Sequence, residues 1–362
     1  MRRVSAVRRC RWSVGGTAEL SGNYVCANNP MIISGCTASF DGTGTVAPST
    51  LTLSSGTLGG SNVVTVGSAM SWTGGSMSGT GRTVISPGAT LTIANPSFLT
   101  ISTRTLENGG TTVWTGAGNI NLDAAVITNR VGALFNAQNS SPIIFGGGTP
   151  RFDNAGTFRK SGSTGTTAIG GSVSFTNYGT VDIQTGVLAA NGGYASSSNA
   201  VLNCAIAGTI PATNYGQLQV SGSVTLNGTL SVNLTNNYIP ATNDSFTVLT
   251  AGTRNGTFAN FIYPSNQVSM LLSNTSTSVI VRVTDVLVVA KPLLMPPQLS
   301  GSNINLTWTA VSNTTYRVEF NPDLDPSNWH ALPGDVTAVT DVASKLDILT
   351  LSNRFYRIQI IP

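Results

Sequence analysis

Four short segments of this chain repeat one pattern, and this repetition constrains the fold more than any other feature. The segments are residues 106–113 (LENGGTTV), 127–134 (ITNRVGAL), 152–158 (FDNAGTF) and 175–181 (FTNYGTV). Each contains one asparagine at the same place, and these are Asn108, Asn129, Asn154 and Asn177. A recurrence with so short and nearly constant a period is typical of solenoids, whose units are too small to bury their apolar side alone and pack on their neighbours.

Each repeat has the composition of a strand, a tight corner and a second strand. A large apolar residue, a polar residue and asparagine are followed by glycine and another apolar residue. Asparagine and glycine tolerate the left-handed backbone conformation that many corners require. Stacked asparagines can also form hydrogen bonds along the stack. The expected structural corners are Asn108, Gly110, Asn129, Gly132, Asn154, Gly156, Asn177 and Gly179.

Looser versions of the same unit lie on both sides, at residues 51–58, 89–93 and 224–230. Only 9% of residues are charged, but 40% are hydrophobic and regularly spaced, which favours a packed fold over disorder. No long stretch follows the periodicity of a helix. We therefore expect an all-β chain dominated by a right-handed parallel β-solenoid, or β-helix.

The pattern divides the chain into four parts. Residues 1–40 are an atypical N-terminal segment or cap, and residues 41–284 are the solenoid, with end coils and a cap from about residue 205. Residues 285–297 are a linker whose prolines cannot continue a β-ladder. Residues 298–362 contain alternating strands, which predict a small antiparallel β-sandwich.

The region from about residue 205 carries a resemblance to a known family. Its motifs are residues 215–218 (YGQL), 228–230 (GTL), 244–249 (DSFTVL) and 255–258 (NGTF). It resembles the passenger segments of secreted bacterial proteins with autotransporter-associated β-strand repeats, which are filamentous-haemagglutinin-like. The resemblance implies an exported solenoid.

Residues 298–362 resemble a fibronectin type III-like module, which closes many secreted multidomain bacterial proteins. The resemblance lies in residues 306–308 (LTW), 316–320 (YRVEF) and 354–357 (RFYR). This part is shorter than the usual module, so a first strand is missing or borrowed. Trp308 is the expected core residue.

The net charge of +4 does not point to a nucleic-acid partner. Five arginines fall at the very start of the chain, and the remainder is close to neutral, without aromatic platforms behind this basic arm. No signal peptide is visible, and no apolar run of about 20 residues predicts a transmembrane segment. We expect an extracellular or cell-surface bacterial location from composition and resemblance alone.

The four cysteines are Cys10, Cys26, Cys36 and Cys204. Cys26 and Cys36 are spaced to close a small loop in an oxidising compartment, and isolated buried thiols are the alternative. The chain has no Cys-x-x-Cys pair, so we expect no zinc site, and no other cofactor is predicted.

Catalytic groups are sparse. Between residues 12 and 284 the only acids are Glu19, Asp41, Glu107, Asp123, Asp153, Asp182 and Asp244. Asp153 and Asp182 lie on neighbouring repeats at different phases of the coil, so their convergence into a glycosidase-like pair is not expected. The single histidine, His330, lies in the C-terminal module, and no phosphate-binding loop is present. No catalytic residue is predicted.

Aromatic residues give a different possible site. Trp72, Trp114 and Tyr178 belong to different repeats and would form a stripe for sugar stacking if they faced outward on one side. The alternative is that they fill the interior, and the repeat does not decide which way Trp72 and Trp114 point.

These observations favour a non-enzymatic extracellular structural or adhesin-like surface protein that presents an extended β-surface. Polysaccharide or cell-surface and matrix components are the expected partners. The alternative function is a carbohydrate-binding or polysaccharide-degrading β-helix.

Overall fold

The computed structural model describes residues 11–12, 15–26, 30–286, 291–349 and 353–361. Every regular element in these residues is a β-strand, and none is a helix. The chain divides into two compact units, Met1–Val286 and Leu287–Pro362. The expectation of an all-β fold with a solenoid and small antiparallel sheets is confirmed.

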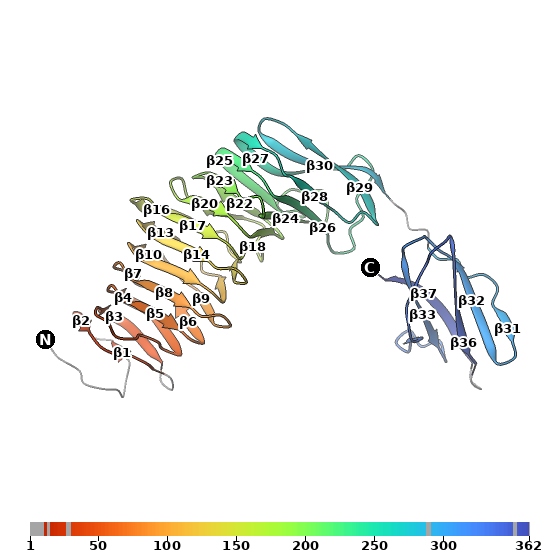
Figure 1. Ribbon diagram of the computed structural model, residues 1–362, viewed down its shortest axis with the longest axis horizontal. Helices are drawn as coiled ribbons and strands as arrows, with labels where there is room; N and C mark the ends of the chain where they lie inside the picture. Colours follow the sequence, from red (N-terminus) through yellow and green to blue (C-terminus); the bar gives the residue numbers. More distant parts are fainter. Residues whose placement is uncertain (1–10, 13–14, 27–29, 287–290, 350–352, 362) are drawn as a thin grey trace. The chain divides into compact units, whose positions relative to one another are not determined.

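The first unit is a parallel β-solenoid in which the chain winds through three faces. Each strand hydrogen-bonds in parallel register to the strand one winding before it and one winding after it. Figure 1 shows these strands stacked in chain order. Because the backbone groups pair between windings, the whole column shares one continuous ladder.

We name two of the three faces after a buried residue type that recurs on them, and call the remaining one the third face. The asparagine face consists of β5 (Val63–Val66), β8 (Arg82–Ile85), β11 (Thr105–Asn108), β14 (Val126–Asn129), β17 (Arg151–Asn154), β20 (Ser174–Asn177) and β23 (Tyr194–Ser196). The tryptophan face consists of β6 (Ala69–Trp72), β9 (Thr90–Ile93), β12 (Thr111–Trp114), β15 (Leu134–Ala137), β18 (Thr157–Lys160), β21 (Thr180–Ile183), β24 (Val201–Ile206), β26 (Thr229–Leu234) and β28 (Asn260–Ile262). The third face consists of β7 (Ser76–Ser78), β10 (Leu99–Ser102), β13 (Ile120–Asp123), β16 (Ile143–Gly147), β19 (Thr166–Ile169) and β22 (Val187–Ala190).

Longer strands continue the faces at both ends of this column. At the N-terminal end, β3 (Met31–Phe40) pairs with β1 (Arg11–Trp12), with β2 (Thr17–Leu20) and with β4 (Thr50–Gly59), and β4 contacts both β6 and β7. Pairing therefore starts within the segment 1–40. At the other end, β25 (Gln217–Leu226) pairs with both β22 and β23, so one strand runs across a corner.

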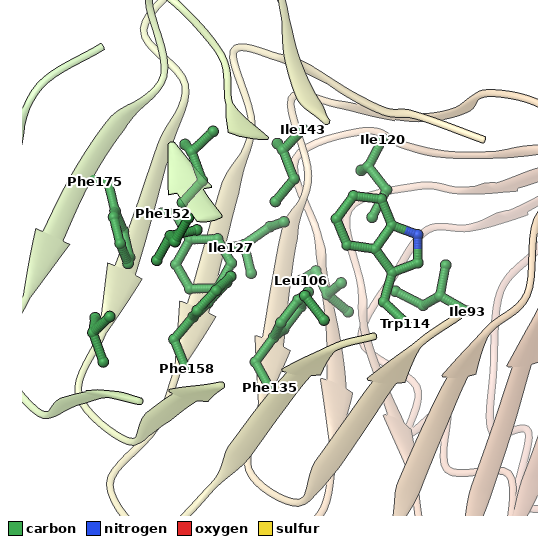
Figure 2. Packing of buried hydrophobic residues seen from close by; sticks show 14 of the residues in the cluster. Ile93, Leu106, Trp114, Ile120, Ile127, Phe135, Ile143, Phe152, Phe158 and Phe175 are labelled. Carbon is green, nitrogen blue, oxygen red and sulfur yellow. The ribbon is translucent and has the colours of Figure 1, made fainter. Parts of the chain in front are cut away.

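The solenoid interior is filled by every second side chain of most strands. Four phenylalanines from the asparagine and tryptophan faces meet there: Phe135, Phe152, Phe158 and Phe175 (Figure 2). The ring centroids of Phe152 and Phe135 are 5.2 Å apart in an edge-to-face arrangement, and those of Phe152 and Phe175 are 5.6 Å apart. Such pairs add about 1 kcal/mol each to the burial of their area.

The repeated asparagines form a buried ladder along the asparagine face. Each is the last residue of its strand, and all four are fully buried. The amide Nδ2 of each donates to Oδ1 of the next over 2.8 Å, from Asn108 through Asn129 and Asn154 to Asn177. The last amide donates to the hydroxyl of Tyr194 at 3.1 Å. The expected hydrogen bonds between stacked asparagines are confirmed.

The expected reason for the glycines is wrong at most of these corners. Of the eight corner residues only Gly132 has a positive φ, of 80°. At Gly110, Gly156 and Gly179 the limit is space, since an added Cβ would lie 2.1 to 2.3 Å from a carbonyl oxygen of the preceding winding. Glycine is therefore needed there for close backbone approach between windings, not for a left-handed conformation.

Replacing Gly132 should lower stability only moderately, and the cause is the backbone conformation and not a lack of space. A Cβ at this position meets no atom within 4 Å, so Gly132→Ala adds only the strain of a left-handed backbone. We expect a loss of about 1 kcal/mol in the free energy of unfolding. Chemical denaturation of the two proteins measures this difference, and a loss above about 3 kcal/mol would show that the site is tightly packed after all.

The C-terminal end of the first unit changes from parallel to antiparallel pairing. β27 (Ser245–Gly256) pairs in parallel with β25 but antiparallel with β30 (Ser278–Val286), which in turn pairs antiparallel with β29 (Val268–Asn274). Phe246, Val279 and Val281 are fully buried below this layer. The antiparallel strands thus cover the core at the end of the third face.

The second unit contains two small antiparallel sheets around a common core. One has β31 (Gln298–Ser300), β32 (Asn303–Thr309) and β36 (Val342–Ile348), and the other has β33 (Thr315–Asn321), β34 (His330–Ala331), β35 (Val336–Thr337) and β37 (Phe355–Ile361). Trp308 is fully buried and meets Tyr316 edge to face, with ring centroids 5.8 Å apart. Trp308 is thus a core residue, as expected.

The proposed pairing of Cys26 with Cys36 is wrong. Cys26 is disulfide-bonded, but Cys36 and Cys204 are free, buried thiols. Cys10 lies outside the described residues. Burial raises the pKa of both free thiols, which keeps them protonated and unreactive at neutral pH.

Candidate functional site

The structure does not bring Asp153 and Asp182 together. Asp153 lies on β17 of the asparagine face, where its Oδ2 accepts a hydrogen bond from Nε of Arg151 at 2.7 Å. Asp182 lies on β21 of the tryptophan face, where its Oδ2 accepts one from Nε of Arg159 at 2.8 Å. Each carboxylate is thus held in its own ion pair on a different face, and the two do not form a glycosidase-like site.

Other catalytic or metal-binding groups do not cluster either. Within the described part of the chain, no three His, Cys, Asp or Glu side chains are close enough to hold a metal ion. His330 is an exposed residue of the second unit whose Nε2 lies 2.7 Å from Oδ1 of Asn328, and its ring lies beside Phe320. No helix in the described residues is long and apolar enough to cross a membrane.

The possible aromatic stripe is not present. Trp72 and Trp114 are the last, inward residues of β6 and β12 and have no exposed surface. They alternate in one column with Ile93, and Nε1 of Trp114 donates to Oδ1 of Asn95 at 3.2 Å. Of the three aromatic residues only Tyr178, which is 52% exposed, faces solvent.

Two buried cations lie inside the solenoid, and neither forms an ion pair with a carboxylate of the described residues, although Asp41 is near enough to interact with Arg104 electrostatically. The guanidinium of Arg104 donates to Oγ1 of Thr83 and to four backbone carbonyls of earlier windings, and burial lowers its pKa to about 10. Lys160, the last residue of β18, has Nζ 2.7 Å from the carbonyl oxygen of Ser163, and burial lowers its pKa to about 8. Neither side chain reaches the surface, so both are structural groups.

A polar groove of about 620 Å³ lies on the outer side of the tryptophan face, towards the C-terminal end of the column. We call it the amide groove, because five of the residues that line it carry side-chain amides: Gln184, Asn203, Asn214, Asn233 and Asn236. Three threonines, one ion pair and two alanines complete the lining, and none of the described lining residues is aromatic. The volume lies within the range of small-molecule sites.

The floor of the amide groove is a row of hydrogen-bonded side chains from successive strands. Arg159 on β18 pairs in register with Asp182 on β21, and Asp182 with Asn203 on β24. Nδ2 of Asn203 donates to Oδ1 of Asp182 at 2.8 Å, and Nδ2 of Asn233 on β26 donates to Oδ1 of Asn203 at 2.9 Å. Gln184 also donates to Asp182, at 3.2 Å. The row therefore crosses four strands of the column.

The walls of the groove come from two long connections, residues 207–216 between β24 and β25 and residues 235–244 between β26 and β27. The equivalent connection one winding earlier is only residues 184–186. The first wall is tied to that earlier winding, since Oγ1 of Thr185 and the amide nitrogen of Gly186 both donate to the carbonyl oxygen of Ala212. The two connections begin at the same edge of the face, one winding apart, and border its polar row there.

The groove has the chemistry of a binding site. Amide and hydroxyl groups both donate and accept hydrogen bonds, which suits a ligand rich in hydroxyl groups. Its one carboxylate, on Asp182, is bound to three partners, and the described lining holds no histidine or cysteine to act as base or nucleophile. A neutral polar ligand can be held there by hydrogen bonds alone.

The repeat pattern does not predict this groove. Asp182 was expected only as one of the sparse acids, and no motif marks Arg159, Asn203 or Asn233. Their spacing of about one winding and their outward position on the strands were the available signals. The two long connections were a further signal, since a solenoid extends loops above a face where windings carry insertions.

A scan of the chain against models of protein families gives no match, and a search of curated proteins gives none either.

Proposed function

We propose that this chain is a non-enzymatic structural or adhesin-like protein of the bacterial cell surface or extracellular space. The observation that carries this proposal is the parallel column itself, whose apolar interior leaves the outward side chains of three faces free for contact. Continuous ladders limit local opening and hence proteolysis, which suits a protein outside the cell.

The sequence resemblances support the same proposal in more detail. The motifs from residue 215 to residue 258 resemble autotransporter-associated repeats, and they lie in the last windings and the antiparallel end of the solenoid. The second unit has two antiparallel sheets, which agrees with a fibronectin type III-like module that acts as a spacer or attachment domain. Both resemblances favour export and surface attachment.

Carbohydrate binding is a second candidate function, and the amide groove favours it. The polysaccharide-degrading variant of this alternative has less support, because Asp153 and Asp182 lie on different faces and each is paired with an arginine.

Adhesion and cleavage can be measured on the same preparation. Beads coated with the full chain should be retained on immobilised bacterial exopolysaccharide or extracellular-matrix material more strongly than beads coated with serum albumin. The same protein should release no reducing ends from the polysaccharides. Release that disappears in Asp182→Ala would favour an enzyme, and retention equal to the albumin control on every surface would exclude the adhesin-like function.

A further inference from the structure

We propose that the amide groove binds a short, uncharged oligosaccharide whose chain lies along the column, across β18, β21, β24 and β26. This inference rests on the proposed surface-binding function and names the ligand class and the place where it binds. The argument depends on four properties of the groove: its hydrogen-bonding groups, its charge, its length and its walls.

The floor presents hydrogen-bonding groups that are already held in place. Asn203 and Asn233 each use one amide hydrogen within the row, so the other hydrogen of each Nδ2 and the Oδ1 of Asn233 remain for a ligand. The hydrogen-bond network fixes the orientation of each amide. The carboxylate of Asp182 can only accept a hydrogen bond, so Asn203 must turn its Nδ2 towards Asp182 and its Oδ1 towards Asn233. Groups that are oriented before binding lose little conformational freedom when a ligand arrives. Pairs of donors and acceptors at fixed positions match the hydroxyl groups of a sugar.

The charge of the groove favours an uncharged ligand. Arg159 and Asp182 are its only charged lining residues, and they neutralise each other through the hydrogen bond from Nε to Oδ2 at 2.8 Å. The Arg159 side chain is 35% exposed, and its two Nη groups have no hydrogen-bond partner among the described residues. These groups can donate to sugar hydroxyls, but an anion would meet Asp182 directly behind them. A uronate is therefore a weaker ligand than a neutral sugar.

The dimensions of the groove fit a chain of a few sugar units. Neighbouring strands of a sheet are about 4.8 Å apart, so the row from β18 to β26 spans about 14 Å. The walls at residues 207–216 and 235–244 both follow the ends of paired strands, β24 and β26, so they border the ligand along one edge of the row. A peptide is a poorer occupant, because an extended peptide also needs pockets for its alternate side chains, and the described lining provides only two alanines as apolar contacts.

A blocking substitution on the groove floor tests the location. Asn233 is exposed, so Asn233→Trp should fill the groove without disturbing the core. The probes are tetrasaccharides of glucose, mannose and N-acetylglucosamine, titrated into the full chain by calorimetry. We expect Asn233→Trp to weaken the best of these ligands at least about tenfold, as the loss of one or two hydrogen bonds would. The matched control is Asn274→Trp, at an exposed asparagine of β29, which should change the affinity less than about twofold.

A charge substitution tests the ligand class. In Asp182→Asn, Arg159 loses its carboxylate partner, so the groove becomes positively charged. We expect weaker binding of the neutral tetrasaccharide, by about tenfold, and tighter binding of a galacturonate tetrasaccharide than in the unmodified chain. The matched control is Asp153→Asn, which breaks the equivalent ion pair with Arg151 on the asparagine face and should change neither affinity.

The outcomes separate this inference from the proposed function. The groove is not the binding site if no neutral tetrasaccharide binds to the chain, or if Asn233→Trp leaves tetrasaccharide binding intact. If the coated beads still adhere to bacterial exopolysaccharide in either case, the surface function stands. Preference of the unmodified chain for galacturonate, or binding of neutral peptides in place of the sugars, would overturn the ligand class. If neither adhesion nor sugar binding is found, both proposals fail.

Discussion

Asn154→Leu should lower the free energy of unfolding by about 3 kcal/mol. The Asn154 side chain is fully buried and makes three hydrogen bonds of 2.8 Å, to Asn129, to Asn177 and to the carbonyl oxygen of Thr180. Leucine has nearly the same shape but cannot form these bonds. Each buried polar group left without a partner costs about 1 to 3 kcal/mol, and the better burial of leucine offsets only part of this cost.

Denaturation followed by circular dichroism measures this loss, with amide hydrogen exchange as a local readout. Because each winding contacts only its neighbours, exchange should accelerate most in β14, β17 and β20. The control is Thr128→Leu, at an outward position of β14, which should change stability by less than about 0.5 kcal/mol. Equal effects of the two substitutions would show that the ladder contributes no more than surface residues do.

Lys160→Met should stabilise the protein by about 2 kcal/mol at pH 7. Lys160 is fully buried, its amine has the carbonyl oxygen of Ser163 as acceptor, and burial lowers its pKa from 10.5 to about 8. Below pH 8 the native state must therefore hold a charged amine inside the column. A pKa shift of one unit corresponds to about 1.4 kcal/mol, and methionine fills a similar volume without the charge.

The sign of the pH dependence follows from the lowered pKa. Between about pH 8 and the unfolded-state value of 10.5, the unfolded chain binds the proton of Lys160 and the native chain does not. The stability of the unmodified protein therefore rises with pH in this window, and the advantage of Lys160→Met shrinks. Denaturation of both proteins at several pH values measures this difference, with Arg151→Met as an exposed control. A constant difference across the window would contradict the assigned shift.

The repeated segments were sufficient to predict the solenoid and its asparagine ladder. A period of one winding places equivalent side chains above one another, so an asparagine that recurs with this period must meet its own copy. The repeat pattern did not predict why glycine is required at the corners. At Gly156 and Gly179 the controlling distance is to a carbonyl oxygen of the preceding winding, and a single repeat contains no information on how closely two windings approach.

The candidate site depended on contacts that the sequence pattern does not encode. Asp182 meets Arg159 and Asn203 only because β18, β21 and β24 pair in one register on the same face. Asp153 is also the third residue of its strand, β17, but that strand lies on the asparagine face. Spacing in the sequence likewise left open whether Cys26 and Cys36 pair or are isolated thiols, and the structure shows that Cys36 is free.

By itself, the sequence determined the class of fold, the winding period and the identity of the buried ladder, because all three follow from which residue types recur and at what interval. Only the tertiary structure decided the direction of Trp72 and Trp114, the tight contacts at the corner glycines and the existence of the amide groove. These depend on where each corner places the start of the next strand. A shift of one residue at that point turns every following side chain from the interior to the surface.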